Sequence, residues 1–114
     1  MPYISTKVSV SLSKEKEVSI KKKLGEAIAL IPGKSEQWLM VSLEENCTLY
    51  FKGSAERPIA YTEVKLFGRS TKDAYQKLTA RITAILQEEL GISADCVYIT
   101  YTEVEHWGWN GNNF

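Results

Sequence analysis

Residues 60–91 read AYTEVKLFGRSTKDAYQKLTARITAILQEELG, and this stretch decides the fold. Residues 60–67 have the β-branched and aromatic content of a strand. Ser70 and Asp73 then match a capping pair at the start of a helix. Apolar residues follow at helical spacing until Gly91 ends the helix, namely Tyr75, Leu78, Ile82, Ile85, Leu86 and Leu90. Because residues 97–102 again resemble a strand, the stretch predicts a strand–helix–strand (βαβ) unit.

The first half of the chain repeats this plan. Residues 3–12 alternate, with Ile4, Val8, Val10 and Leu12 on one face and Tyr3, Ser5, Lys7, Ser9 and Ser11 on the other. Ser13 is a candidate N-cap for a helix that runs to Pro32-Gly33, and residues 38–43 predict the next strand. The strand starts are offset by roughly 56 residues. We therefore expect a single domain over residues 1–114, with duplicated halves at about 2–45 and 58–104.

The duplication predicts where polar residues meet. The two strands of a βαβ unit are parallel, so the loop that leaves the helix returns to the end where the first strand starts. Pro2 and Lys34 should therefore lie at the same end of the sheet, joined by Phe67 if the halves pair antiparallel. Tyr98 and Thr100 should lie at the opposite end. They could reach Pro2 only from another subunit.

Composition and charge exclude several classes of function. Fourteen basic and fourteen acidic residues balance, so we expect neither a nucleic-acid partner nor a membrane surface. No apolar run approaches the ~18 residues of a membrane span, and no secretory signal is recognisable. Cys47, Cys96 and His106 show no metal-ligand spacing, so we expect no metal and no cofactor. The expected location is the cytoplasm, or outside the cell after release without a signal peptide.

The dipeptide Met1-Pro2 suggests acid–base chemistry by the N-terminal amine. Methionine aminopeptidase normally removes an initiator Met that precedes a small residue, so the mature chain should begin with the secondary amine of Pro2. An unperturbed N-terminal amine has a pKa of about 7.7–8.0. Burial and the nearby ammonium of Lys34 would both lower that pKa. The amine of Pro2 could then act as a general base at neutral pH.

Several short motifs together carry a resemblance to a known family. They are Met1-Pro2, Gly33-Lys34, Phe51-Lys52-Gly53-Ser54, Phe67-Gly68, Val97-Tyr98-Ile99 and the ending Trp107-Gly108-Trp109-Asn110-Gly111 through Phe114. In order and spacing the chain resembles the macrophage migration inhibitory factor (MIF) family of the tautomerase superfamily over its whole length. The resemblance implies an α+β fold with a four-stranded mixed sheet and two helices on one face. It also implies a homotrimer with an active site at each subunit interface.

The resemblance further implies a cofactor-free isomerase, a keto–enol tautomerase of phenylpyruvate-like aryl 2-keto acids. By position, Pro2 would be the catalytic base, Lys34 would bind the substrate carboxylate, and the amide of Phe67 would donate to the substrate. Tyr98 would come from the neighbouring subunit. Five aromatic side chains could form the apolar floor of the pocket: Tyr3, Trp38, Tyr98, Trp109 and Phe114. The alternative is that they pack in the core or in the trimer interface.

This chain departs from the family pattern at three places. Thr100 stands where well-studied members have asparagine, which has more hydrogen-bond donors. Phe67 replaces the usual isoleucine and changes the pocket wall. Ile59 and Thr62 lie where mammalian members have a CxxC pair, so a thiol–disulfide oxidoreductase is not supported.

Two other functions remain open. The chain could be a MIF-like cytokine mimic that binds a host receptor, if exported, and keeps only a vestigial pocket. It could also be a related isomerase or hydratase that uses Pro2 on a different unsaturated acid. Receptor binding that survives loss of the pocket would favour the first, and substrate profiling would identify the second.

Overall fold

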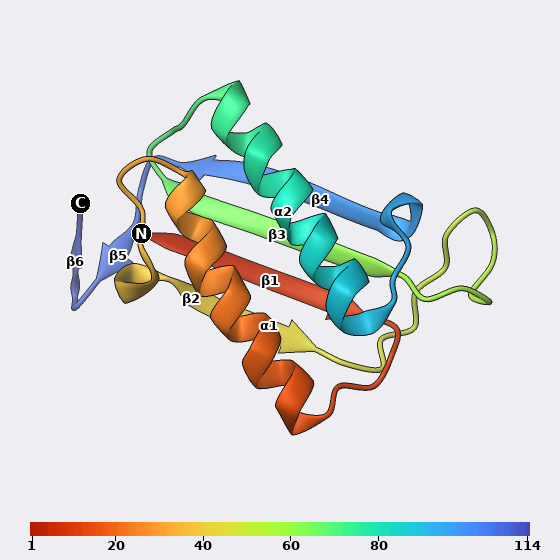
Figure 1. Ribbon diagram of the computed structural model, residues 1–114. Coiled ribbons are helices and arrows are strands. Elements are labelled where there is room, and N and C mark those ends of the chain that lie inside the picture. Colours follow the sequence, from red (N-terminus) through yellow and green to blue (C-terminus); the bar gives the residue numbers. More distant parts are fainter.

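The computed structural model describes all 114 residues as one mixed sheet covered by helices on one face (Figure 1). The main elements are β1 (Pro2–Val8), α1 (Lys14–Ala27), β2 (Met40–Glu44), β3 (Ala60–Phe67), α2 (Lys72–Leu90) and β4 (Val97–Val104). Short 3-10 helices lie at Ile28–Leu30 (η1), Glu36–Trp38 (η2) and Ala94–Cys96 (η3). A two-stranded hairpin, β5 (Gly108–Trp109) and β6 (Asn112–Asn113), ends the chain. The predicted α+β class with a four-stranded mixed sheet and two helices is confirmed.

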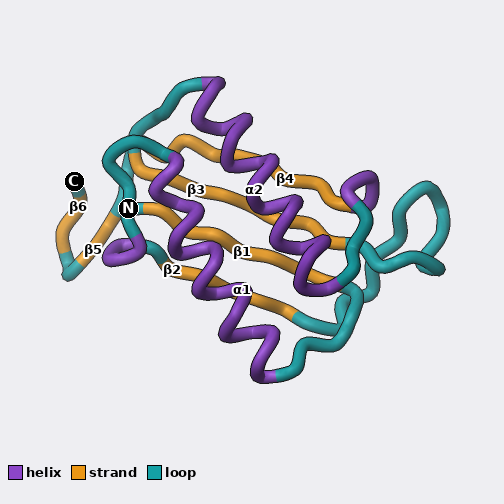
Figure 2. Tube along the Cα trace, in the orientation of Figure 1, coloured by secondary structure: helices purple, strands orange, loops and turns teal.

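The sheet has the strand order β2-β1-β3-β4. The pairs β1–β2 and β3–β4 are parallel, as expected for two βαβ units, and the central pair β1–β3 is antiparallel. At the centre of that pair Thr6 lies opposite Thr62, 56 residues further along, and their buried hydroxyl oxygens are 3.0 Å apart. Figure 2 shows both chain termini at the same end of the sheet.

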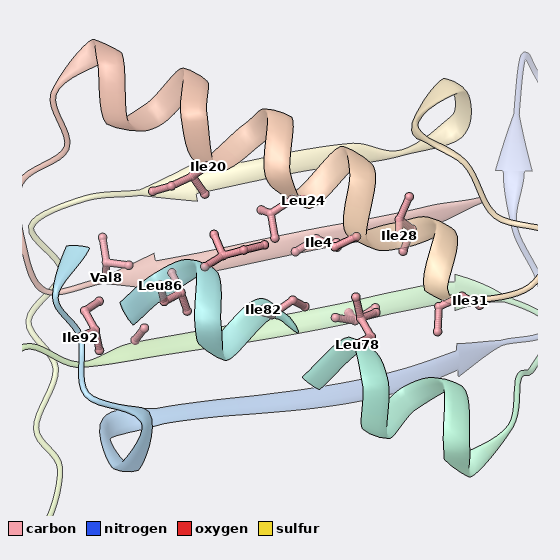
Figure 3. Close-up of a cluster of buried hydrophobic side chains, with 14 of the residues drawn as sticks. Ile4, Val8, Ile20, Leu24, Ile28, Ile31, Leu78, Ile82, Leu86 and Ile92 are labelled. Atoms are coloured by element: carbon pink, nitrogen blue, oxygen red, sulfur yellow. The ribbon is translucent and has the colours of Figure 1, made fainter. Parts of the chain in front are cut away.

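The core lies between the sheet and the two helices (Figure 3). In β3 buried residues alternate strictly with partly exposed ones, and β1 does the same up to its end. Isoleucines and leucines of α1 and α2 meet that face, and the largest fully buried side chains include Ile4, Ile20, Leu24, Leu78 and Ile82. The periods of 2 and 3.6 in the sequence therefore correspond to one apolar layer. No helix is long and apolar enough to cross a membrane.

The helix ends agree with the sequence at two places and differ at two. Ser13 caps α1 by accepting a hydrogen bond from the amide of Lys16, and Gly91 ends α2 in the left-handed conformation, with φ of +67°. The first helix, predicted to run to Pro32-Gly33, ends as an α-helix at Ala27 and continues as η1 to Leu30, before the turn in which Gly33 has a positive φ. The predicted cap of α2 at Ser70 is wrong, because Thr71 is the N-cap and accepts from the amide of Ala74 at 3.1 Å. Either hydroxyl satisfies the cap preference, which explains the one-residue error.

The strand boundaries need three corrections. The first strand ends at Val8 rather than at residue 12, because the amide of Ser9 bonds Ile59 and the carbonyl of Val10 accepts from Asn46 as the chain bends away. The second strand begins at Met40, since Trp38 belongs to η2. The last long strand continues past residue 102 to Val104.

Candidate active site

The start of β1 brings together the groups that the sequence placed at one end of the sheet. The carbonyl of Met1 accepts a hydrogen bond from the amide of Phe67 at 3.0 Å, which continues the β1–β3 ladder by one residue. Pro2 itself is buried. Lys34 follows the turn at Gly33, and its ammonium donates to the carbonyl of Phe67 at 3.1 Å. The predicted meeting of Pro2, Lys34 and Phe67 is therefore what the backbone shows.

The N-terminal amine lies in a setting that favours its neutral form. Partial burial is the largest cause of a lowered pKa for the amine of Met1, followed by the positive charge of Lys34 and a hydrogen bond with that side chain. Both burial and a neighbouring cation penalise the ammonium relative to the neutral amine. With Met1 in place the basic nitrogen belongs to Met1, because the nitrogen of Pro2 is part of an amide.

A cavity of about 540 Å³ opens beside the start of β1. It is lined by residues of the first strand, of the segment around η2 and of the C-terminal hairpin, and most of them are apolar: Met1, Pro2, Tyr3, Gln37, Trp38, Leu39, Met40, Trp107, Gly108 and Trp109. The rings of Trp38 and Trp109 meet edge to face, with centroids 5.1 Å apart. Such a volume and an aromatic lining suit a small aryl compound.

The structure brings most of the predicted site residues to this end. Pro2, Tyr3, Trp38 and Trp109 line the cavity directly. Lys34 and Phe67 lie beside the terminal amine rather than in the cavity lining. Phe114 packs on the Phe67 ring, with centroids 5.5 Å apart, and it remains 55% exposed.

Tyr98 and Thr100 do not lie near this site in the same chain. Tyr98 pairs with Tyr61, which in turn pairs with Lys7, five residues along β1 from Pro2. At ~3.3 Å per residue the separation along the sheet is roughly 16 Å. The Tyr98 side chain is 62% exposed and meets the ring of Phe51 edge to face. The hydroxyl of Thr100 bonds that of Tyr61 at 3.0 Å.

Several lining residues were missed from the sequence. Gln37, Leu39 and Met40 surround Trp38, and Met40 lies opposite Tyr3 in the β1–β2 register. The pairing of Tyr3 with the start of β2 was the signal that could have identified Met40. Trp107 also lines the cavity, together with Trp109. The hairpin strand that contains Trp109 has only two residues, too few for a periodic pattern that would predict which side chains face the cavity.

This end of the sheet presents the N-terminal amine, the side-chain ammonium of Lys34 and the backbone amide of Phe67. No group of three His, Cys, Asp or Glu side chains is placed to hold a metal ion anywhere in the chain. The amine can transfer a proton, and the ammonium of Lys34 beside it can stabilise negative charge.

Comparison with known proteins agrees with this architecture. The family model for macrophage migration inhibitory factor matches residues 1–114. The structure of Leishmania major MIF2 is 34% identical, with a TM-score of 0.93, over 100% of this chain and 97% of that chain. The MIF homologue from Prochlorococcus marinus is 31% identical, with a TM-score of 0.82, over 98% of each chain.

A more distant structure shares the fold alone. Pt0534, solved after inactivation by 2-oxo-3-pentynoate, is 19% identical, with a TM-score of 0.85, over 96% of this chain and 93% of that chain. A search of curated protein sequences found no match. The match of the family model to every residue, together with the two relatives above 30% identity, leads to one conclusion. The chain belongs to the macrophage migration inhibitory factor family of the tautomerase superfamily.

Proposed function

We propose that this chain, once Met1 is removed, is a cofactor-free keto–enol tautomerase of phenylpyruvate-like aryl 2-keto acids. The observation that carries the proposal is the position of the N-terminus: the amine of Met1 lies beside Lys34, and the next residue, Pro2, lines a cavity walled by Trp38 and Trp109. Pt0534, which has the same fold, is inactivated by 2-oxo-3-pentynoate, a compound with the 2-oxo acid group that we propose for the substrate here.

The reaction needs one proton to move between carbon and oxygen. The neutral amine of Pro2 takes the proton from the carbon next to the ketone, and the electrons of that C–H bond form the enolate. The protonated amine then returns the proton to the oxygen, which gives the enol; the reverse sequence gives the ketone. Burial and the positive charge of Lys34, which lower the pKa of the Met1 amine in the intact chain, would favour the neutral, proton-accepting form of the Pro2 amine in the same way.

Lys34 and Phe67 would bind the acid end of the substrate. The ammonium of Lys34 can pair with the carboxylate and stabilise the charge that develops on the enolate. The amide of Phe67 donates to the carbonyl of Met1 in the intact chain, so removal of Met1 would release this donor for a substrate oxygen. The aryl group would then lie against the aromatic wall of the cavity.

We propose that Tyr98 reaches this site from a neighbouring subunit of a homotrimer. Its exposed ring lies at the far end of its own sheet, so an intersubunit arrangement is the one that combines it with Pro2. The prediction is a trimer by light scattering, and a Tyr98→Phe variant that stays trimeric but has a raised KM for phenylpyruvate. A monomer with full activity would refute the intersubunit site.

Intact mass combined with a tautomerase assay on the same sample tests the proposed function. We expect the mass of the chain without Met1, ketonisation of enolic phenylpyruvate, and loss of most activity in Pro2→Gly. Ser11→Gly is the control, because Ser11 is exposed in the segment that follows β1 and does not line the cavity. Full activity of Pro2→Gly would overturn the role of Pro2.

A further inference from the structure

One wall of the cavity is a segment with little structure of its own. Glu36–Trp38 form the single turn η2, closed by the hydrogen bond from the amide of Leu39 to the carbonyl of Glu36 at 3.1 Å. Gln37, Trp38 and Leu39 all line the cavity. Figure 1 shows this turn at the end of the sheet, between β5 and the start of β2. A lone 3-10 turn has few hydrogen bonds, so its position depends on the surface it packs against.

That surface is a face of α1. A Cβ atom added to Gly25 would collide with Oε2 and Cδ of Glu36 and would lie 2.9 Å from its Cγ. The carboxylate end of the Glu36 side chain therefore covers Gly25 and would have to move if residue 25 had a Cβ atom. Its Oε2 also lies 3.4 Å from the ammonium of Lys21. Lys21 is one helical turn before Gly25, so both residues lie on the same face of α1.

The identity of residue 25 supports a specific purpose for this contact. Glycine inside a helix is unfavourable relative to alanine, and Gly25 lies near the end of α1 with ordinary helical backbone. The approach of Glu36 accounts for a glycine here. The ion pair with Lys21 is weaker support, because both side chains are half-exposed or more and such pairs contribute little.

We propose that Glu36 is a positioning residue that docks η2 onto α1, with Gly25 as the surface beneath its carboxylate. The contact holds Trp38 edge to face against Trp109 and so sets the width of the cavity available to the substrate's aryl group. The structural part of the inference stands on its own, and its kinetic consequence rests on the proposed tautomerase function.

The test is a double-mutant cycle of Gly25→Ala and Glu36→Ala. The first readout is the circular dichroism couplet of the Trp38–Trp109 pair, defined as the difference between wild type and Trp38→Phe. We expect each single variant to lose at least half of this couplet. Adding Gly25→Ala to Glu36→Ala should change nothing further, because the added methyl group then has no carboxylate to displace. Glu26→Ala, an exposed glutamate of the same helix, is the matched control.

A couplet that is unchanged in both single variants, or losses that add in the double variant, would overturn the proposal. The second readout is kinetic. We expect KM for phenylpyruvate to rise about two- to tenfold in each single variant, as for the loss of one aromatic contact, while kcat stays within twofold. If the wild-type protein has no tautomerase activity, the proposed function fails, and the dichroism cycle still decides the role of Glu36.

Discussion

A chain that keeps Met1 and a chain that begins at Pro2 differ by one residue, and we expect activity and stability to change in opposite directions. With Met1 present, the nitrogen of Pro2 is an amide whose lone pair is delocalised, so it has no basicity. The nearest free amine is that of Met1, one residue or ~3.5 Å further along the chain. A positioned general base contributes ~10²–10⁴-fold to rate, so retention of Met1 should lower kcat/KM by about that factor.

The stability difference follows from one hydrogen bond. The carbonyl of Met1 accepts from the amide of Phe67 at 3.0 Å, and removal of Met1 eliminates that acceptor. A backbone hydrogen bond has a net value of about 0.5–1.5 kcal/mol. For a domain of this size that corresponds to a fall in Tm of roughly 2–8 °C in the processed chain. A 2-keto acid should reverse part of the fall, because it binds only the form that presents the free amide.

Both forms can be prepared by cell-free synthesis, with and without added methionine aminopeptidase, and checked by intact mass. Activity is measured as phenylpyruvate ketonisation and stability as thermal unfolding at equal protein concentrations. Equal kcat/KM in the two forms would refute the assignment of Pro2 as the base. A processed chain as stable as the intact one would refute the importance of the Met1–Phe67 bond.

Three further predictions concern individual contacts. Lys34→Met should raise the pKa of the Met1 amine without restoring its ordinary value, because burial is the larger cause of the shift. The pKa is measured from the pH dependence of amine acylation, and an unchanged pKa would contradict the role of Lys34. The pKa of this amine is lower in the folded than in the unfolded chain, so the free energy of unfolding should rise with pH between the two pKa values. In Lys34→Met the two pKa values lie closer together, so this rise should be smaller. Thr62→Val leaves the buried hydroxyl of Thr6 without its partner and should cost about 1–3 kcal/mol in urea unfolding, whereas Thr6→Val/Thr62→Val should recover most of the loss; additive losses would be inconsistent with the pair. Hydrogen bonds from Arg57 lower the pKa of Asp95 to about 2, so Arg57→Ala should raise this pKa towards 3.8 in an NMR titration. An unchanged pKa would show that Arg57 is not the cause of the shift.

The secondary structure was predictable where one period dominated. The strand predicted at residues 60–67 matches β3 to the residue, and this central strand buries one face along its whole length. Val10 and Leu12 continue the same alternation but pack against the core from a bend, since hydrogen-bond partners outside the sheet decide where β1 ends. Periodicity reports which side chains are buried and not which strand the backbone pairs with.

The site was predictable only in part, for a related reason. The meeting of Pro2, Lys34 and Phe67 follows from the direction of the strands, which the βαβ rule determines. The aromatic wall does not follow from that rule. Trp38 and Trp109 are 71 positions apart in a 3-10 turn and a two-residue strand, and their contact depends on how two irregular segments fold over the sheet end. No local pattern encodes such a contact.

The duplicated plan also explains why one chain has one such site. The offset of 56 residues that relates Thr6 to Thr62 places Pro58 at the position that corresponds to Pro2. Pro58 is inside the chain, so its nitrogen is always an amide. After the two helix-exit glycines, Gly33 and Gly91, the first half has Lys34, whereas the second half has a fully buried isoleucine. The second corner therefore has no free amine and no lysine after its glycine, although Lys52 and Arg57 line a pocket there with Ile59, and it presents Tyr98 outward. The duplicated plan thus places the proposed base at one corner and an exposed aromatic ring at the other, as the proposed intersubunit site would require.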